Sequence, residues 1–269
     1  MLDISPLGLG TVKFGRNQQI KYPDAFALPE DQEIVELLSV AQTLGMNHLD
    51  TAPAYGSSEE RIGRLLQDRH RWIISSKTGE TFVDGVSHYN FTPEFTIASV
   101  ERSLKRLRTD YIDIVFVHSD GSDGAIIHKY GTLDALAVLK QRGLIRSYGL
   151  SVKDPAAALA SLPFCEALMV EYHLAMTPEQ RMVTEALLEQ AMRYNRLVCV
   201  KKALVSGHLN KIRELSSDTD QTMDPVEASL RFVFAHPSVK NVIIGSINPQ
   251  HLVVNLEAYH RAINSIKHD

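Results

Sequence analysis

The sequence has few cysteines, no long apolar run and no basic run, and each absence excludes a class of protein. Only two of its 269 residues are cysteines, Cys165 and Cys199, and both stand in apolar runs, which favours buried free thiols over a disulfide or a metal site. No stretch approaches about eighteen uninterrupted apolar residues, and the first residues lack a secretory signal pattern, so we expect a cytoplasmic protein that binds no membrane. Since the formal net charge is −4 and no Lys/Arg block occurs, we expect no nucleic-acid partner.

Metal-binding patterns are also missing. The eleven histidines show neither an HExxH motif nor paired ligand spacing. The segment DGSDG (120–124) contains acids and glycines without the spacing of a calcium loop, which predicts a polar turn. We therefore expect no metal.

Short β-branched runs alternate with longer segments of helical spacing, a pattern that predicts a parallel sheet with crossover helices. The expected strands cover residues 8–14, 46–50, 71–77, 111–117, 145–151, 166–172, 197–202 and 241–245. Eight such units predict one α/β domain over residues 1–269, a (β/α)8 TIM barrel with parallel strands inside and helices outside. A doubly wound open sheet is the competing architecture, but the Gly-rich phosphate turn after its first strand is missing.

Capping residues followed by proline mark the expected helix starts. They are Thr92-Pro93, Asp154-Pro155, Thr177-Pro178, Asp224-Pro225 and Asn248-Pro249. Ser57 with Glu60 predicts a capping box and a helix that begins just after Gly56, while Gly45 and Gly143 predict helix ends. Residues 203–224 are expected to form a loop over the barrel mouth, with a short helix near 208–215.

Four ionisable residues fall at or just past the ends of successive expected strands. They are Asp50, Tyr55, Lys77 and His118. In a (β/α)8 barrel these strand ends converge on the face that carries active sites, so the four side chains can meet. An ammonium beside a tyrosine favours the phenolate and lowers the pKa of the phenol, which makes it a usable acid, and an aspartate can keep the lysine charged. A histidine there could orient a substrate oxygen.

These residues lie in segments that resemble the aldo-keto reductase family. GMNHLDTAPAYGSSEERIGRLL (45–66) resembles the family signature around its catalytic Asp and Tyr, and SSKTG (75–79) resembles the segment with its catalytic Lys. The run SVERSLKRLRTDYIDIVFVHSDG (99–121) is similar to the helix and strand before its catalytic His. GLGTVKFG at the start, GLIRSYGLS (143–151) and residues 229–256 extend the resemblance over nearly the whole chain.

The resemblance implies an NAD(P)H-dependent reductase of small-molecule carbonyls. Hydride then comes from a nicotinamide cofactor bound without a Rossmann domain, and the proton comes from Tyr55. By motif, Lys77 tunes Tyr55, Asp50 pairs with Lys77, and His118 positions the substrate oxygen. The implied cofactor is NADPH, with NADH possible.

The resemblance also implies cofactor contacts. Near the nicotinamide it points to Gly10, Thr11, Val12 and Asp50, with Ser151 holding the carboxamide. Two usual carboxamide contacts are replaced, because Val152 stands where Asn is usual and Met169 where Gln is usual. For the phosphates it points to Lys202, Leu204, Gly245, Ser246, Asn248, His251 and Asn255.

The position that commonly holds an arginine for the 2′-phosphate is His251, and Val254 replaces the acid before Asn255. A neutral histidine is a weaker partner for phosphate than the bidentate, permanently charged arginine. We therefore expect NADPH to be preferred over NADH by a modest margin, which widens in mildly acidic solution as a histidine gains charge.

Alternative interpretations remain open at this level. Ser246 and Asn248 beside a helix start suit an anion, but Asn248 alone could be a plain helix cap. Phe82, His88, Tyr89 and Phe91 suit either a substrate pocket or an exposed loop. A Schiff-base aldolase would use Lys77 as nucleophile, and a regulatory barrel would bind cofactor with weak turnover. The sequence does not indicate the physiological substrate or the oligomeric state.

Overall fold

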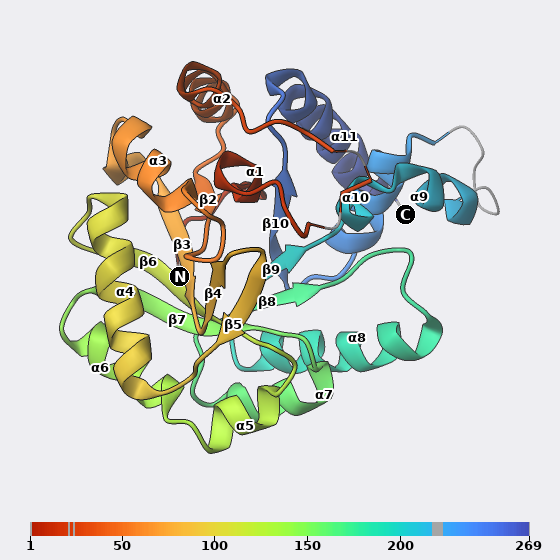
Figure 1. Ribbon diagram of the computed structural model, residues 1–269. Helices are drawn as coiled ribbons and strands as arrows, with labels where there is room; N and C mark the ends of the chain where they lie inside the picture. Colours follow the sequence, from red (N-terminus) through yellow and green to blue (C-terminus); the bar gives the residue numbers. More distant parts are fainter. Residues whose placement is uncertain (1, 21, 24, 217–222, 269) are drawn as a thin grey trace.

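The computed structural model describes residues 2–20, 22–23, 25–216 and 223–268, and its centre is a closed barrel of parallel strands (Figure 1). The eight barrel strands are β1 (Leu7–Gly10), β2 (His48–Asp50), β3 (Ile73–Thr78), β6 (Ile112–His118), β7 (Ile145–Ser151), β8 (Ala167–Glu171), β9 (Leu197–Lys201) and β10 (Val239–Gly245). Their order around the barrel is β1-β10-β9-β8-β7-β6-β3-β2, and the pairing of β1 with β2 closes it. The predicted (β/α)8 fold is confirmed.

Helices surround the barrel as an outer ring in Figure 1. They are α2 (Asp31–Thr43), α3 (Ser58–Leu65), α4 (Pro93–Leu107), α5 (Asp123–His128), α6 (Thr132–Gln141), α7 (Pro155–Ala158), α8 (Pro178–Arg193), α9 (Leu209–Ser216), α10 (Pro225–Phe234) and α11 (Pro249–His268). Short 3₁₀ turns are η1 (Arg69–Arg71), η2 (Leu159–Ser161) and η3 (Val205–Gly207). The short helix expected near 208–215 corresponds to α9; part of the expected 203–224 loop lies outside the described residues.

The predicted Pro-marked helix starts are confirmed by their caps. The Thr177 hydroxyl accepts the Gln180 N–H at 3.3 Å, and the Gln180 side chain returns a bond to the Thr177 N–H, completing a capping box. Asp154 and Asp224 each accept two backbone N–H groups from the first turn of their helices. These bonds satisfy donors that have no partner within the helix.

Two local predictions are wrong. The first strand ends at Gly10 instead of continuing to residue 14, because Thr11 turns the chain onto β2 through bonds to the Asp50 carbonyl, and the helix α1 (Val12–Gly15) follows. The Ser57 side chain makes no cap, because the backbone there (φ −84°, ψ 8°) is not in the extended conformation typical of a capping residue, and the Glu60 side chain pairs with Arg106 at 3.2 Å. Helix α3 nevertheless begins at Ser58, just after Gly56.

A hairpin that the sequence reading did not predict follows β3. Strands β4 (Glu80–Val83) and β5 (Val86–Tyr89) pair antiparallel, outside the barrel sheet. The turn uses Asp84 and Gly85, both at positive φ. An Asp-Gly pair is a common hairpin turn, because both of its residues tolerate that backbone conformation. The hairpin brings new side chains to the same end of the barrel as Lys77.

The barrel interior is filled by side chains of alternate strand residues. A buried cluster inside it contains Ile114, Phe116, Ala167, Met169, Leu197 and Cys199. Both cysteines are buried and free, as predicted. The cluster contains two inward-facing residues from each of β6, β8 and β9. Because side chains alternate in a strand, the next inward-facing residue of each strand lies at the C-terminal end of the barrel, which we call the mouth.

Candidate active site

The mouth is lined by the last inward residues of the strands. In β6, β8 and β9 the residues that face inward alternate, so the next one after the interior cluster is His118, Glu171 and Lys201, respectively. These three residues therefore lie at the mouth. Asp50 and Lys77 reach the same level from β2 and β3, where they contact each other. A band of charged and polar side chains therefore caps the apolar barrel interior.

Lys77 is the centre of the predicted cluster. Its Nζ atom donates to both carboxylate oxygens of Asp50, at 2.9 and 2.8 Å, and to the Thr51 carbonyl at 2.9 Å. Burial lowers the pKa of Lys77, but the charge of Asp50 and the phenol of Tyr55 outweigh it, so the net shift is upward. Lys77 is only 2% exposed and remains an ammonium ion.

Asp50 is held from below by a buried polar chain. Ser75 donates its hydroxyl to Asp50 Oδ1 at 2.7 Å, and His48 lies between Ser75 and Asn241, 2.9 Å from each. His48 fills space that any side chain at position 8 would need, since a Cβ on Gly8 would lie 2.6 Å from its ring. This chain fixes the carboxylate that orients Lys77.

Tyr55 and His118 complete the cluster. Lys77 Nζ lies 4.7 Å from the centre of the Tyr55 ring, and the Tyr55 and His118 rings lie 6.3 Å apart, edge to face. Burial raises the pKa of Tyr55, and Lys77 only partly opposes this because Asp50 acts with burial. The structure thus brings the four predicted residues together. Lys77 acts on the Tyr55 pKa in the expected direction, but the expected net lowering is wrong because burial is the larger effect.

His118 has a partner that sequence reasoning missed. Its Nδ1 atom lies 2.6 Å from Oε2 of Glu80 on the hairpin, and Ser87 donates to the other oxygen of that carboxylate at 2.6 Å. Burial raises the pKa of Glu80, but His118 and Ser87 outweigh it and lower the pKa to about 2. Burial lowers the pKa of His118 against the effect of Glu80, so the imidazole is neutral at pH 7.

The predicted cofactor residues divide into two groups around the mouth. Thr11 is buried and donates to the Asp50 carbonyl, while Met169 packs in the barrel interior instead of lining the mouth. Lys202, expected at the pyrophosphate, pairs with Glu171. Ser151, expected at the carboxamide, accepts a hydrogen bond from Lys201 Nζ at 2.9 Å.

The second group gathers at the start of α11. The Ser246 hydroxyl accepts the Asn248 N–H at 3.0 Å, and Asn248 accepts the Gln250 N–H at 2.9 Å, so Asn248 does cap the helix. Ser246 and Asn255 are buried, and His251 is exposed.

The connection after α1 also reaches the mouth. A Cβ added to Gly245 would lie 2.1 Å from the Tyr22 hydroxyl, so Tyr22 lies directly over Gly245. The same connection carries Arg16, whose guanidinium lies 3.4 Å from the centre of the Phe82 ring and donates to the Ala54 carbonyl at 3.1 Å. No motif in the sequence indicated that Tyr22 or Arg16 would belong to the site, because long-range folding of a loop brings them there.

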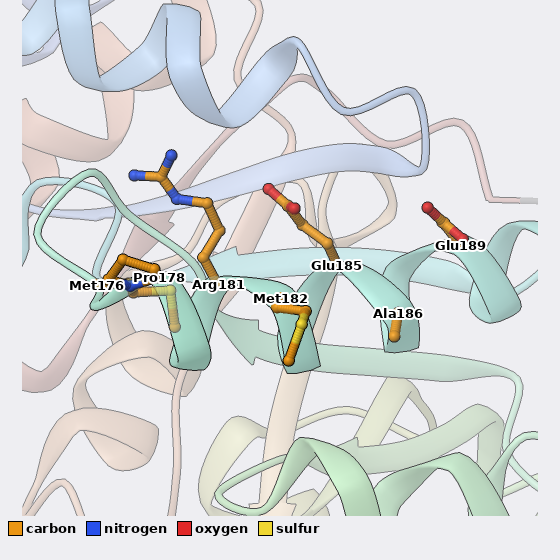
Figure 2. A pocket seen from close by; sticks show the side chains of 7 residues that line it. All are labelled: Met176, Pro178, Arg181, Met182, Glu185, Ala186 and Glu189. Carbon is orange, nitrogen blue, oxygen red and sulfur yellow. The ribbon is translucent and has the colours of Figure 1, made fainter.

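The aromatic residues of segment 82–91 take different places. Tyr89 stacks on Phe91 with ring centres 6.1 Å apart. Phe91 is buried in the main hydrophobic core, while Tyr89 is 39% exposed. A surface groove also exists elsewhere, along α8 on the outside of the barrel. Figure 2 shows the residues that line it, Met176, Pro178, Arg181, Met182, Glu185, Ala186 and Glu189. None belongs to the cluster at the mouth, so the groove is separate from the candidate site.

Among the described residues, no group of three or more His, Cys, Asp or Glu side chains could hold a metal ion. Nor does any described helix combine the length and apolar character needed to cross a membrane.

Comparison with known proteins adds independent information. The model of the aldo/keto reductase family matches residues 6–268. The chain is 28% identical to the uncharacterized oxidoreductase YqkF of Bacillus subtilis over 96% of this chain and 88% of that protein. It is 33% identical to D-arabinose 1-dehydrogenase of Saccharomyces cerevisiae over 56% of this chain and 44% of that enzyme. A crystal structure of PA4992 from Pseudomonas aeruginosa, provisionally assigned to the aldo-keto reductases, superposes with a TM-score of 0.84 at 44% identity and covers 97% of this chain and 92% of that one.

Proposed function

Because this chain belongs to the aldo/keto reductase family, we propose that it reduces aldehyde or ketone carbonyls to alcohols with NADPH, or catalyses the reverse reaction. The family and the oxidoreductases among its relatives make it an oxidoreductase, and members of this family generally use nicotinamide cofactors. The observation that supports the proposal best is the contact of Lys77 with Asp50 below the Tyr55 ring.

Tyr55 is the proposed proton donor. Its raised pKa keeps the phenol protonated at neutral pH, which is the form that a donor needs before reaction. Once the proton has moved to the substrate oxygen, the ammonium of Lys77 stabilises the phenolate that remains. Asp50 keeps Lys77 charged in this buried position.

His118 is the proposed contact for the substrate oxygen. With Glu80 beside Nδ1, a neutral imidazole that carries its proton there presents a lone pair at Nε2. In that state it can accept a hydrogen bond from an alcohol, and it donates to a carbonyl oxygen only after protonation. Glu80 favours the proton on Nδ1, so whether Nε2 of His118 accepts or donates this hydrogen bond depends on protonation of the ring, and hence on pH.

The donors around the mouth suit an anionic dinucleotide. Ser151, Lys202, Ser246 and the start of α11 supply neutral and cationic donors, and the Tyr22 hydroxyl lies over Gly245. When bound, the nicotinamide would supply the hydride. We propose the other contacts on the same grounds: Thr11, Val12 and Asp50 near the nicotinamide, and Leu204, Asn248, His251 and Asn255 near the phosphates.

An aldolase reaction at Lys77 is disfavoured. A nucleophilic lysine needs a free lone pair, whereas Lys77 is buried, paired with Asp50 and raised in pKa.

The test of the proposed function is NADPH oxidation, followed by absorbance, across aldehydes, aldoses, ketoses and aromatic ketones. Aldoses belong in the panel because one relative is named for D-arabinose. Turnover with at least one carbonyl is expected. Tight NADPH binding without turnover on any of them would support the regulatory alternative instead.

The preference for NADPH has its own test at His251. Replacing this exposed histidine with arginine, His251→Arg, should widen the ratio of kcat/KM for NADPH over NADH by about tenfold, because a bidentate, permanently charged contact with the 2′-phosphate replaces a single hydrogen bond. His260→Arg, on the same helix, is the control. An unchanged ratio in His251→Arg would remove His251 from the phosphate site.

A further inference from the structure

Lys201 is the second lysine that reaches the mouth. It is the last residue of β9, two residues beyond Cys199, and alternation from the interior cluster turns it inward. Unlike Lys77, which is almost fully buried, Lys201 is partly exposed. Part of the Lys201 side chain is therefore open to solvent at the mouth.

The partners of Lys201 are neutral. Its Nζ atom donates to Ser151 Oγ at 2.9 Å and to the Val152 carbonyl at 3.0 Å. Within the described part of the chain, no carboxylate lies in ion-pair range of Lys201, whereas Lys77 is paired with Asp50 and Lys202 with Glu171.

The number of partners matches a neutral amine. Such an amine has two N–H groups, one for each of the two acceptors, and a lone pair that remains free. An ammonium would carry a third N–H without a described partner.

The charges around Lys201 favour the same state. Burial is the largest effect, and the neighbouring ammonium groups of Lys202, Lys77 and Lys153 add to it. Glu171, across the β8–β9 pair, opposes them, yet the pKa of Lys201 still falls to about 7. His118, from β6, is close enough to feel the charge of Lys201.

We propose that Lys201 is a covalent binding site for small aldehydes, which condense with its amine to form an imine at the mouth of the barrel. The Nζ lone pair attacks the carbonyl carbon, and proton transfer gives a carbinolamine. Loss of water, formed from the carbonyl oxygen and the two amine hydrogens, leaves the C=N bond. No oxidant or reductant takes part, so the adduct forms and hydrolyses reversibly.

The test is reductive trapping of the full-length protein by glycolaldehyde and sodium cyanoborohydride at about pH 7. The borohydride reduces the imine to a stable secondary amine, and peptide mapping by mass spectrometry gives the labelling rate of each lysine. Since an amine with a pKa of about 7 is roughly half neutral at this pH and an ordinary lysine almost none, Lys201 should be labelled at least about tenfold faster than exposed lysines.

Variants make the outcome specific. Lys201→Met should remove the fast phase, and Lys240→Met, which replaces an exposed lysine whose amine donates to the Pro237 carbonyl, should retain it. In Lys202→Met, labelling of Lys201 should persist but require higher pH, because one repelling charge is gone.

Equal labelling of Lys201 and the surface lysines would overturn the proposal, as would preferential labelling of Lys77. Because the trapping uses no nicotinamide cofactor, its failure would leave the proposed carbonyl reduction untouched. Absence of NADPH turnover would likewise leave the imine chemistry standing.

Discussion

At the scale of single residues, the two lysines of the mouth differ in pKa because they have different partners. Lys77 meets a carboxylate and stays charged, whereas Lys201 meets two neutral oxygens and its pKa falls. The same principle acts on the acids, since Glu80 beside His118 has a pKa of about 2. Burial penalises every one of these charges, and the nearest partner decides which charge survives.

Tyr55→Phe should remove most carbonyl turnover while leaving NADPH binding nearly unchanged. Only the hydroxyl is lost, and positioned acid catalysis contributes about 10²–10⁴ in rate. Steady-state kinetics measure the first effect and quenching of protein fluorescence by NADPH the second. Tyr130→Phe, on an exposed tyrosine, is the control. Wild-type kcat in Tyr55→Phe would rule out this tyrosine as the acid.

Glu80→Gln should lower the pKa of His118 further. The carboxylate is the group that favours the imidazolium, and the neutral amide preserves the shape of the side chain without its charge. Titration of the His118 ring by NMR measures the shift. Ser87→Ala, which removes only a hydrogen bond to Glu80, should produce a smaller one. A His118 pKa that is unaffected by Glu80→Gln would mean that the carboxylate does not act on the ring.

At the scale of elements, the strands bring the site residues together through close backbone contact. The tightest example is β7 against β8, where a Cβ on Gly149 would lie 1.7 Å from the Ala167 carbonyl oxygen. The two strands pair through Gly149 and Ala167, and they place Ser151 beside the end of β6. A side chain at position 149 would therefore force apart the strands that carry Ser151 and Glu171.

Gly149→Ala should destabilise the protein by about 3 kcal/mol or more, because two backbones must separate inside a packed barrel. Urea unfolding followed by circular dichroism measures the change. Gly124→Ala is the matched control, since its Cβ would meet nothing closer than Ala157 at 3.9 Å. Equal stability of the two variants would show that the barrel tolerates wider strand spacing here.

At the scale of the whole molecule, two carboxyl groups with lowered pKa values make the free energy of unfolding depend on pH in the acidic range. Burial raises the pKa of Glu80 and Glu171, but hydrogen-bond and charged partners lower each pKa to about 2. The partners of Glu80 are His118 and Ser87. Those of Glu171 are His173 and Lys202. An unfolded glutamate has a pKa of about 4.3, so the unfolded chain takes up protons first as pH falls. The stabilisation is therefore complete above about pH 4.3 and is lost as pH falls toward 2.

The free energy of unfolding should thus decrease steadily as pH is lowered below about 5. Urea unfolding at a series of pH values gives the slope, and Glu80→Gln should reduce it because one of the two groups no longer titrates. A stability that is independent of pH over this range would contradict the ion pairs at the mouth.

The sequence by itself determined the barrel, most helix starts and the four clustered residues. Their signals are local: β-branched runs, Pro-marked caps such as Thr177-Pro178, and charged residues at strand ends. A closed barrel of parallel strands then brings these strand ends to one face. Only the tertiary structure decided which partner each charge meets. Glu80 reaches His118 through a hairpin, Lys202 turns to Glu171, and Lys201 is left with neutral acceptors. The pKa of each group depends on burial and on charges that are distant in sequence but close in space. No local sequence pattern could therefore show that the pKa of Tyr55 is raised and that of Lys201 lowered.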